Sequence, residues 1–127
     1  SDNLVIASWT ACEGPCLLSV VIDASGANQG AVFPGGEQFV LDRKRLAIVP
    51  TEATAKITVL DRDTGAQLAQ ATVYDGYTDG MVAAMLDAET IYTAFQSHNP
   101  RGWVVSRVSL PAKGGATVKE QFVRACP

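Results

Sequence analysis

Short apolar runs separated by turn residues dominate the chain and predict β-strands. The runs lie at 17–22, from about 31, and at 39–41, 46–49, 55–60, 67–74, 90–95 and 102–110. Runs of this length, rich in Val, Ile and Thr and bounded by Gly, Pro, Asp or Asn, are typical of strands. We therefore expect about seven or eight strands in one domain over residues 1–127.

The clearest predicted hairpin joins residues 55–60 to residues 67–74. Gly65 lies in the connection and can adopt the positive φ that such turns usually need. In the outgoing arm, Ile57 and Val59 alternate with Thr58 and Leu60. This alternation predicts one buried face and one half-exposed face.

Residues 80–89 have helical rather than strand character. They are rich in the helix-favouring residues Ala, Met, Leu and Glu, and a polar residue precedes them as a cap. Val82, Met85 and Leu86 fall on one face of a helix. The predicted fold is therefore mainly β, an antiparallel β-sandwich or open barrel with one short helix packed at an end. Residues 116–127 fit either a final helix or a strand.

Composition and charge exclude several classes of function. The 127-residue chain is 47% apolar and 18% charged, as expected of a globular domain with its own core. The formal net charge is −3, and we interpret the densest basic run, 43–45, as a solvated turn or edge strand rather than a polyanion site, so no nucleic-acid partner is expected. No stretch approaches the roughly 20 apolar residues that span a bilayer. No signal peptide is visible, as expected of a chain whose targeting segment has been removed.

Three cysteines bear on the cellular compartment. Cys12 and Cys16 have the wrong spacing for a Cys-x-x-Cys redox motif, and Cys126 is the second-last residue. A disulfide from Cys126 to either of them would close a loop of about a hundred residues and stabilise the fold by up to about 4–5 kcal/mol. A bridge between Cys12 and Cys16 would contribute less. The alternative is a zinc site of the three cysteines and His98, although structural zinc sites usually have two closely spaced pairs.

The acidic residues and the single histidine carry little catalytic signal. Asp61 and Asp63, followed by Gly65, resemble the start of a calcium loop, but no distal glutamate completes one. The alternative is a plain turn whose aspartates accept hydrogen bonds from their own backbone. His98 lies in an expected turn, without a nucleophile elbow or a phosphate loop elsewhere in the chain. We therefore assign no catalytic residue.

Aromatic residues are the best candidates for ligand binding. Trp9, Tyr74, Tyr77 and Trp103 could line a groove for a sugar or a peptide, because flat rings suit such ligands. The alternative is that the two tryptophans are core residues that anchor the packed sheets.

Several segments together form a recognisable pattern: Trp9-Thr10-Ala11-Cys12, Cys16, the apolar run that follows, and segments 82–86, 90–95 and 104–110. This pattern resembles that of the invasion-associated locus B family, small exported proteins of α-proteobacteria. The chain differs from the family pattern in having no second cysteine pair ahead of the expected helix. The resemblance implies a periplasmic or surface-associated β-sandwich with a role in host-cell association, without a defined enzymatic activity or a catalytic residue.

These observations together predict an exported, non-enzymatic protein that acts by binding a protein or glycan partner in the periplasm or outside the cell. The first alternative is a calcium- or carbohydrate-binding β-sandwich module that uses Asp61, Asp63 and the aromatic residues. The second is a small hydrolase, which would need two carboxylates with perturbed pKa values in one cleft. No cofactor other than calcium is expected, and the sequence does not indicate an oligomeric state.

Overall fold

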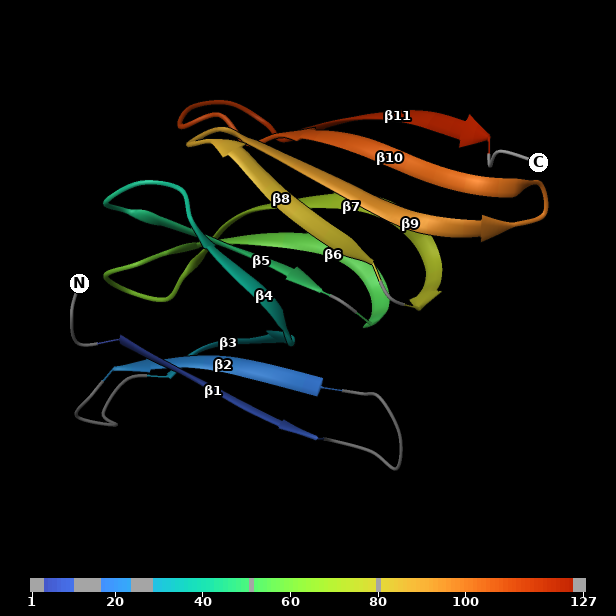
Figure 1. Ribbon diagram of the computed structural model, residues 1–127. Coiled ribbons are helices and arrows are strands. Elements are labelled where there is room, and N and C mark those ends of the chain that lie inside the picture. The colour runs from blue at the N-terminus through green and yellow to red at the C-terminus, as the bar shows by residue number, and fades with distance from the viewer. Residues whose placement is uncertain (1–3, 11–16, 24–28, 51, 80, 125–127) are drawn as a thin grey trace.

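The computed structural model describes residues 4–10, 17–23, 29–50, 52–79 and 81–124, and all regular structure within these ranges is β-strand (Figure 1). The strands are β1 (Leu4–Thr10), β2 (Leu17–Asp23), β3 (Gln29–Pro34), β4 (Gly36–Val40), β5 (Arg45–Pro50), β6 (Glu52–Asp61), β7 (Gln67–Asp79), β8 (Val82–Asp87), β9 (Thr90–His98), β10 (Arg101–Ser109) and β11 (Thr117–Arg124). The prediction of a mainly β fold is confirmed.

The strands form three antiparallel sheets that stack as layers. The N-terminal sheet has the order β1–β2–β3, the central sheet β4–β5–β6–β7, and the C-terminal sheet β11–β10–β9–β8. Figure 1 shows the central sheet between the other two. A large apolar core fills the space between the central and C-terminal sheets, and a smaller core lies between the central and N-terminal sheets.

The two middle strands of the central sheet, β5 and β6, are buried on both faces, because their alternate residues point into different cores. Ala47, Val49, Ile57 and Val59 belong to the larger core, whereas Ile48 and Leu60 belong to the smaller one. Nearly continuous apolar runs are the pattern expected of strands covered on both sides. The prediction of a half-exposed face in β6 is therefore wrong: Thr58 and Leu60 are buried, with the N-terminal sheet on their side.

A close backbone approach marks the passage from the N-terminal sheet to the central sheet. β3 pairs with β2, and after Gly35 the chain enters β4, which pairs with β5. Gly36 lies opposite Pro50, and a Cβ atom at Gly36 would overlap the carbonyl group of Val49. Only glycine allows β4 to lie this close to β5 at that point.

The predicted helix at 80–89 is wrong, because residues 82–87 form strand β8 and Ala88 and Glu89 form a turn. β8 pairs with β9, and the backbone N–H of Glu89 donates to Asp87 Oδ1 at 2.8 Å, which closes the hairpin. Short apolar runs fit helix and strand periods almost equally, so pairing with a neighbouring strand decided the outcome. The final segment, left open between helix and strand, is strand β11.

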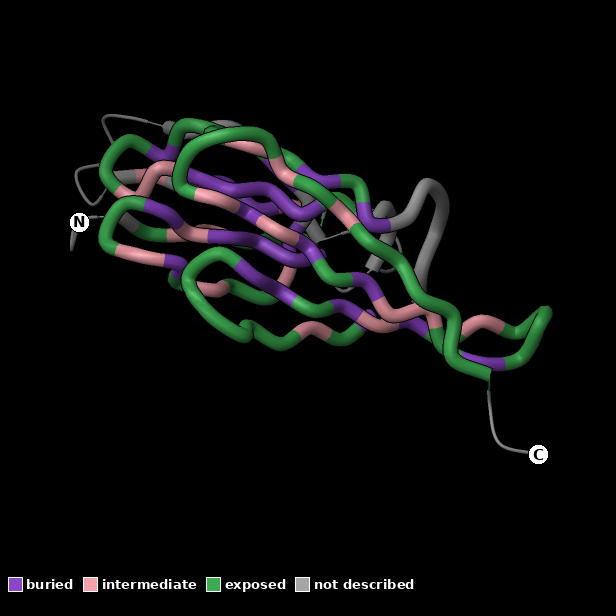
Figure 2. The backbone as a smooth tube through the Cα atoms, turned by 90° about the horizontal axis from the view of Figure 1, so that it is seen from above, coloured by how far each residue is buried: buried purple, intermediate pink, exposed green. Residues whose placement is uncertain are grey.

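Burial is uneven along the C-terminal sheet. The far ends of β9, β10 and β11, near the C-terminus, are mostly exposed, whereas the buried stretches lie in the interior of the stack (Figure 2). Within the described residues, no helix is long and apolar enough to span a membrane.

Candidate functional site

The structure separates the two tryptophans that the sequence analysis grouped together. Trp9 lies in β1 of the N-terminal sheet and Trp103 in β10 of the C-terminal sheet, with the central sheet between these layers (Figure 1). Their side chains are 42% and 41% exposed, so the interpretation of both as core anchors is wrong. Tyr74 and Tyr77 belong to β7 of the central sheet, and their side chains lie outside the described part of the structure.

The cysteine predictions stay predictions. Cys12, Cys16 and Cys126 all lie outside the described residues, so neither a disulfide nor a zinc site is tested. His98 is exposed at the end of β9.

Asp61 and Asp63 lie in the turn between β6 and β7, as predicted. Asp61 Oδ1 accepts hydrogen bonds from the backbone N–H groups of Asp63 (2.8 Å) and Thr64 (3.0 Å), and these bonds lower the pKa of Asp61. Gly65 has φ 71° and donates its N–H to the carbonyl of Asp61. These are the backbone hydrogen bonds expected of a plain turn, and calcium binding by Asp61 and Asp63 stays a prediction. Among the described residues, no group of three or more His, Cys, Asp or Glu side chains could hold a metal ion.

The C-terminal sheet presents one face to the core and the other face away from it. The residues of this outer face are related by strand register: Val82, Ala84 and Asp87 of β8, Thr90, Tyr92, Ala94, Gln96 and His98 of β9, Arg101, Trp103, Val105, Arg107 and Ser109 of β10, and Thr117, Lys119, Gln121 and Val123 of β11. The residues between them, such as Ile91, Phe95 and Val108, belong to the larger core.

Aromatic and basic side chains gather on this outer face. Trp103 is 41% exposed and Tyr92 37% exposed, and Tyr92 lies directly across from Arg107. Arg107 in turn lies across from Lys119 of β11. The outer-face residues include three cations, Arg101, Arg107 and Lys119, and one carboxylate, Asp87, at the end of β8. In a chain of net charge −3, this makes the outer face locally basic.

The residue pattern along β10 is a sequence signal for this face. Trp103, Val105 and Arg107 alternate with Val104, Ser106 and Val108 along a nine-residue strand. Such alternation indicates that the two sets lie on opposite faces, although it does not say which set is covered. Only the packing of β10 against the central sheet shows that the set with the large aromatic ring is the exposed one.

The basic run at 43–45 is only in part the solvated turn that was predicted. Arg43 and Lys44 are exposed in the turn between β4 and β5, but Arg45 is 7% exposed. The Arg45 guanidinium donates from Nε to Asp42 Oδ2 (2.7 Å), from Nη1 to the carbonyl of Leu110 (2.6 Å) and from Nη2 to the carbonyl of Ala88 (3.0 Å). One side chain therefore joins the central sheet to two connecting segments of the C-terminal sheet.

Asp42 is held ionised by the same contacts. Burial alone would raise the pKa of Asp42, but hydrogen bonds from Arg45 Nε and from the backbone N–H groups of Lys44 and Arg45 outweigh that effect. The net result is a pKa below the ordinary value for aspartate.

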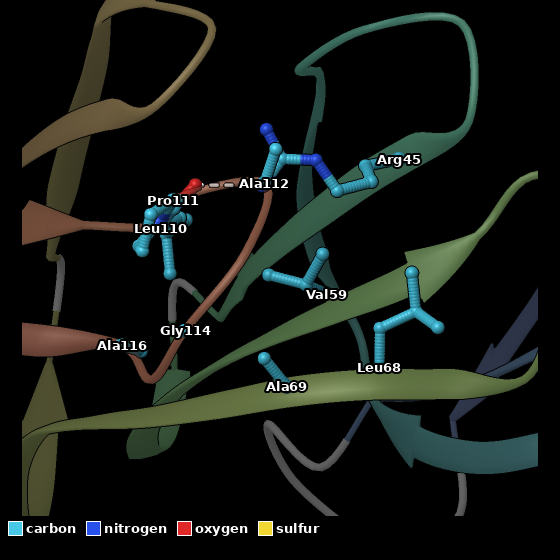
Figure 3. A pocket seen from close by; sticks show the side chains of 9 residues that line it. All are labelled: Arg45, Val59, Leu68, Ala69, Leu110, Pro111, Ala112, Gly114 and Ala116. Carbon is cyan, nitrogen blue, oxygen red and sulfur yellow. Dashed lines mark hydrogen bonds between the residues drawn. The ribbon is translucent and has the colours of Figure 1, made fainter.

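A cavity of about 230 Å³ lies beside Arg45, between β6 and β7 on one side and the segment after β10 on the other (Figure 3). Its walls are mainly apolar and include Val59, Leu68 and Pro111. A wider hollow of about 600 Å³ also includes Arg45 and Leu68, and it reaches the β4–β5 turn. Three of the five N–H groups of Arg45 already donate to protein oxygens, so we interpret this residue as a structural clamp rather than a ligand contact.

Comparisons with known proteins assign no role to the outer face or to the cavity. No family model matches this chain, and no curated protein is similar to it. The resemblance to the invasion-associated locus B family therefore stays a prediction from the quoted motifs.

Proposed function

We propose that this chain is an exported, non-enzymatic binding protein that recognises an acidic protein surface through the outer face of its C-terminal sheet. The observation that carries the proposal is the exposure of Trp103, Tyr92 and Arg107 together on this one face. Trp, Tyr and Arg are the residues that most often dominate the binding energy of protein interfaces. A rigid strand background also holds them in place before binding, which lowers the entropic cost of association.

The chemistry of the outer face supports a protein partner with acidic and apolar groups. Val82, Val105 and Val123 surround the aromatic rings with aliphatic surface, which suits apolar side chains better than sugar hydroxyl groups. Arg107 and Lys119 add positive charge that complements Asp or Glu on the partner and disfavours a basic one.

The location and the biological context of this activity belong to the same proposal. The resemblance to the invasion-associated locus B family supports a periplasmic or surface-associated protein with a role in host-cell association. A layered β-sandwich architecture, with the central and C-terminal sheets packed face to face, accords with that family's expected fold.

Selection from a random peptide library on the immobilised protein tests the proposal. We expect the selected peptides to combine Asp or Glu with apolar residues. Truncation of a central aromatic anchor usually costs 2 kcal/mol or more, so Trp103→Ala should weaken peptide binding by about 10-fold or more. Arg107→Glu should also weaken it and reduce its salt dependence. The matched control is Leu68→Ala, an exposed apolar residue of the central sheet.

Two results would overturn the proposal. Peptides that bind the Trp103→Ala protein as tightly as the wild type would show that the outer face is not the binding surface. Retardation of the wild type, but not of Trp103→Ala, in native gels containing a neutral polysaccharide would favour the carbohydrate alternative. The calcium alternative predicts instead a higher Tm in calcium than in chelator, lost in the Asp63→Asn variant.

A further inference from the structure

The outward edge of β8 has no pairing partner among the described strands. β8 pairs with β9 on one side, from Val82 opposite Ala94 to Asp87 opposite Thr90, with a register shift between Met85 and Asp87. It is the last strand of the C-terminal sheet, so the backbone N–H and C=O groups on its other side face no described strand. Such an edge is a template for one more strand.

The side chains of β8 are unusually apolar for an edge. Val82, Met85 and Leu86 are 58%, 43% and 63% exposed, and β8 contains no charged residue before Asp87. The opposite edge of the same sheet, β11, carries three exposed charges, on Lys119, Glu120 and Arg124. Charged residues on an edge strand normally prevent pairing with other chains. β11 has this protection and β8 does not.

We infer that β8 pairs in antiparallel fashion with β8 of a second copy of this chain, across a twofold axis at Ala84. The pairing joins two four-stranded sheets into one continuous sheet. The edge groups of β8 then gain hydrogen-bond partners, and the exposed apolar side chains of the two β8 strands pack beside each other and are partly shielded from water.

Self-pairing fits because the β8 sequence is complementary to itself in this register. With Ala84 opposite Ala84, Val82 lies opposite Leu86 and Ala83 opposite Met85, so apolar residues meet apolar residues. No two like charges lie opposite each other, since Asp87 falls opposite Met81. In a twofold dimer the same surface of each copy contacts itself, so that surface must be complementary to itself, as β8 is. The outer face, with three cations and one carboxylate, is not.

The interface is small, which sets the expected affinity. One six-residue strand from each copy falls at the low end of interface sizes, below about 1,200 Å² in total. We expect a reversible dimer with a Kd of about 1–100 µM. The dimer does not depend on the proposed acidic partner, although it would place two outer faces side by side on one sheet.

Sedimentation velocity across about 1–300 µM tests this inference on the whole chain, because that range brackets the expected Kd. The wild type should shift from monomer to dimer. The Val82→Lys/Leu86→Lys variant should stay monomeric, because lysines of the two copies would lie opposite each other. The Val82→Lys/Leu86→Glu variant has the same number of new charges, but it places Lys opposite Glu and should dimerise. All these positions are exposed, so the variants should fold, which circular dichroism checks.

The control is Val123→Lys on β11, an exposed apolar residue at the other edge, which should dimerise like the wild type. A wild type that stays monomeric throughout would overturn the inference. So would a Lys/Lys variant that still dimerises, because the interface would then lie elsewhere. Dimer loss in the Lys/Glu variant as well would overturn the register centred on Ala84. Peptide binding at Trp103 is measured separately on the wild type, because Val82 and Val123 belong to the outer face, so failure of the dimer and failure of the proposed function are distinguishable.

Discussion

The central and C-terminal sheets contain similar numbers of apolar residues but use them differently. Both faces of β5 and β6 in the central sheet lie in cores, and Ile57, Val59 and Leu60 are almost fully buried. The C-terminal sheet gives one face to the larger core and leaves Trp103 and Tyr92 exposed on the other. The middle strands of the central sheet therefore contribute to the stability of the fold through both of their faces. The outer face of the C-terminal sheet is free to change without unfolding the protein.

The largest expected effect comes from the central sheet. Ile57→Ala removes a fully buried side chain from the larger core and should lower the free energy of unfolding by about 2–5 kcal/mol. Val82→Ala on the outer face, where the side chain is mostly exposed, should change it by less than about 0.5 kcal/mol. Urea denaturation of both variants measures the difference. Equal losses in the two variants would contradict the division between the sheets.

The next effect concerns the clamp that joins the two sheets. Arg45→Met should lower the free energy of unfolding by about 2–4 kcal/mol, because the carbonyls of Ala88 and Leu110 lose a charged donor. Arg43→Met removes the same kind of side chain from an exposed position two residues earlier and should be nearly neutral. If both variants were neutral, Arg45 would not be a structural link, and its cavity would become a candidate ligand site.

Much of the fold follows from the sequence, because local patterns determine which residues form strands. The runs that became β5, β6, β9 and β10 were predicted from apolar content and turn residues. The turn at Asp61 was also predictable, since its hydrogen bonds are all within a few residues. β8 was not, because its apolar spacing fits a helix and only pairing with β9 makes it a strand.

The sites were less predictable, because they depend on contacts between distant segments. Arg45 is one of three consecutive basic residues, and nothing local distinguishes the buried one. Its acceptor, the Leu110 carbonyl, lies 65 residues away along the chain. Trp9 and Trp103 both lie in strand patterns, but the stacking order of the sheets decides that they are exposed and far apart.

A smaller effect, of opposite sign, should appear on the inner face of the C-terminal sheet. Thr93 and Ser106 lie opposite each other in β9 and β10, are buried, and have hydroxyl oxygens without a hydrogen-bond partner in the structure as described. Thr93→Val combined with Ser106→Ala removes both unpaired groups with little change of shape. We expect the free energy of unfolding to rise by up to about 1 kcal/mol. A thermal melt measures it, with the exposed Thr117→Val as the control. A fall in Tm would contradict this prediction and would show that the two hydroxyl groups form stabilising hydrogen bonds.

The smallest expected effect is the acid sensitivity of the clamp. The pKa of Asp42 is lower in the folded chain than its ordinary value of 3.8, so the unfolded chain binds a proton more readily on acidification. The stabilising contribution of Asp42 is therefore fully present above about pH 4–5 and is lost as the pH falls through the folded pKa. The amide side chain introduced by Asp42→Asn does not take up a proton, so the free energy of unfolding of this variant should fall less steeply between pH 5 and pH 2 than that of the wild type. Urea denaturation at each pH measures this difference.

Asp61 also has a lowered pKa, and Asp61→Asn should remove a separate part of the loss of stability in acid. Because Asp42 bonds to Arg45 and Asp61 bonds only within its own turn, the Arg45→Met background should reduce the effect of Asp42→Asn and leave that of Asp61→Asn unchanged. If the Arg45→Met background reduced the effects of Asp42→Asn and Asp61→Asn equally, the acid sensitivity would not arise from the ion pair between Asp42 and Arg45.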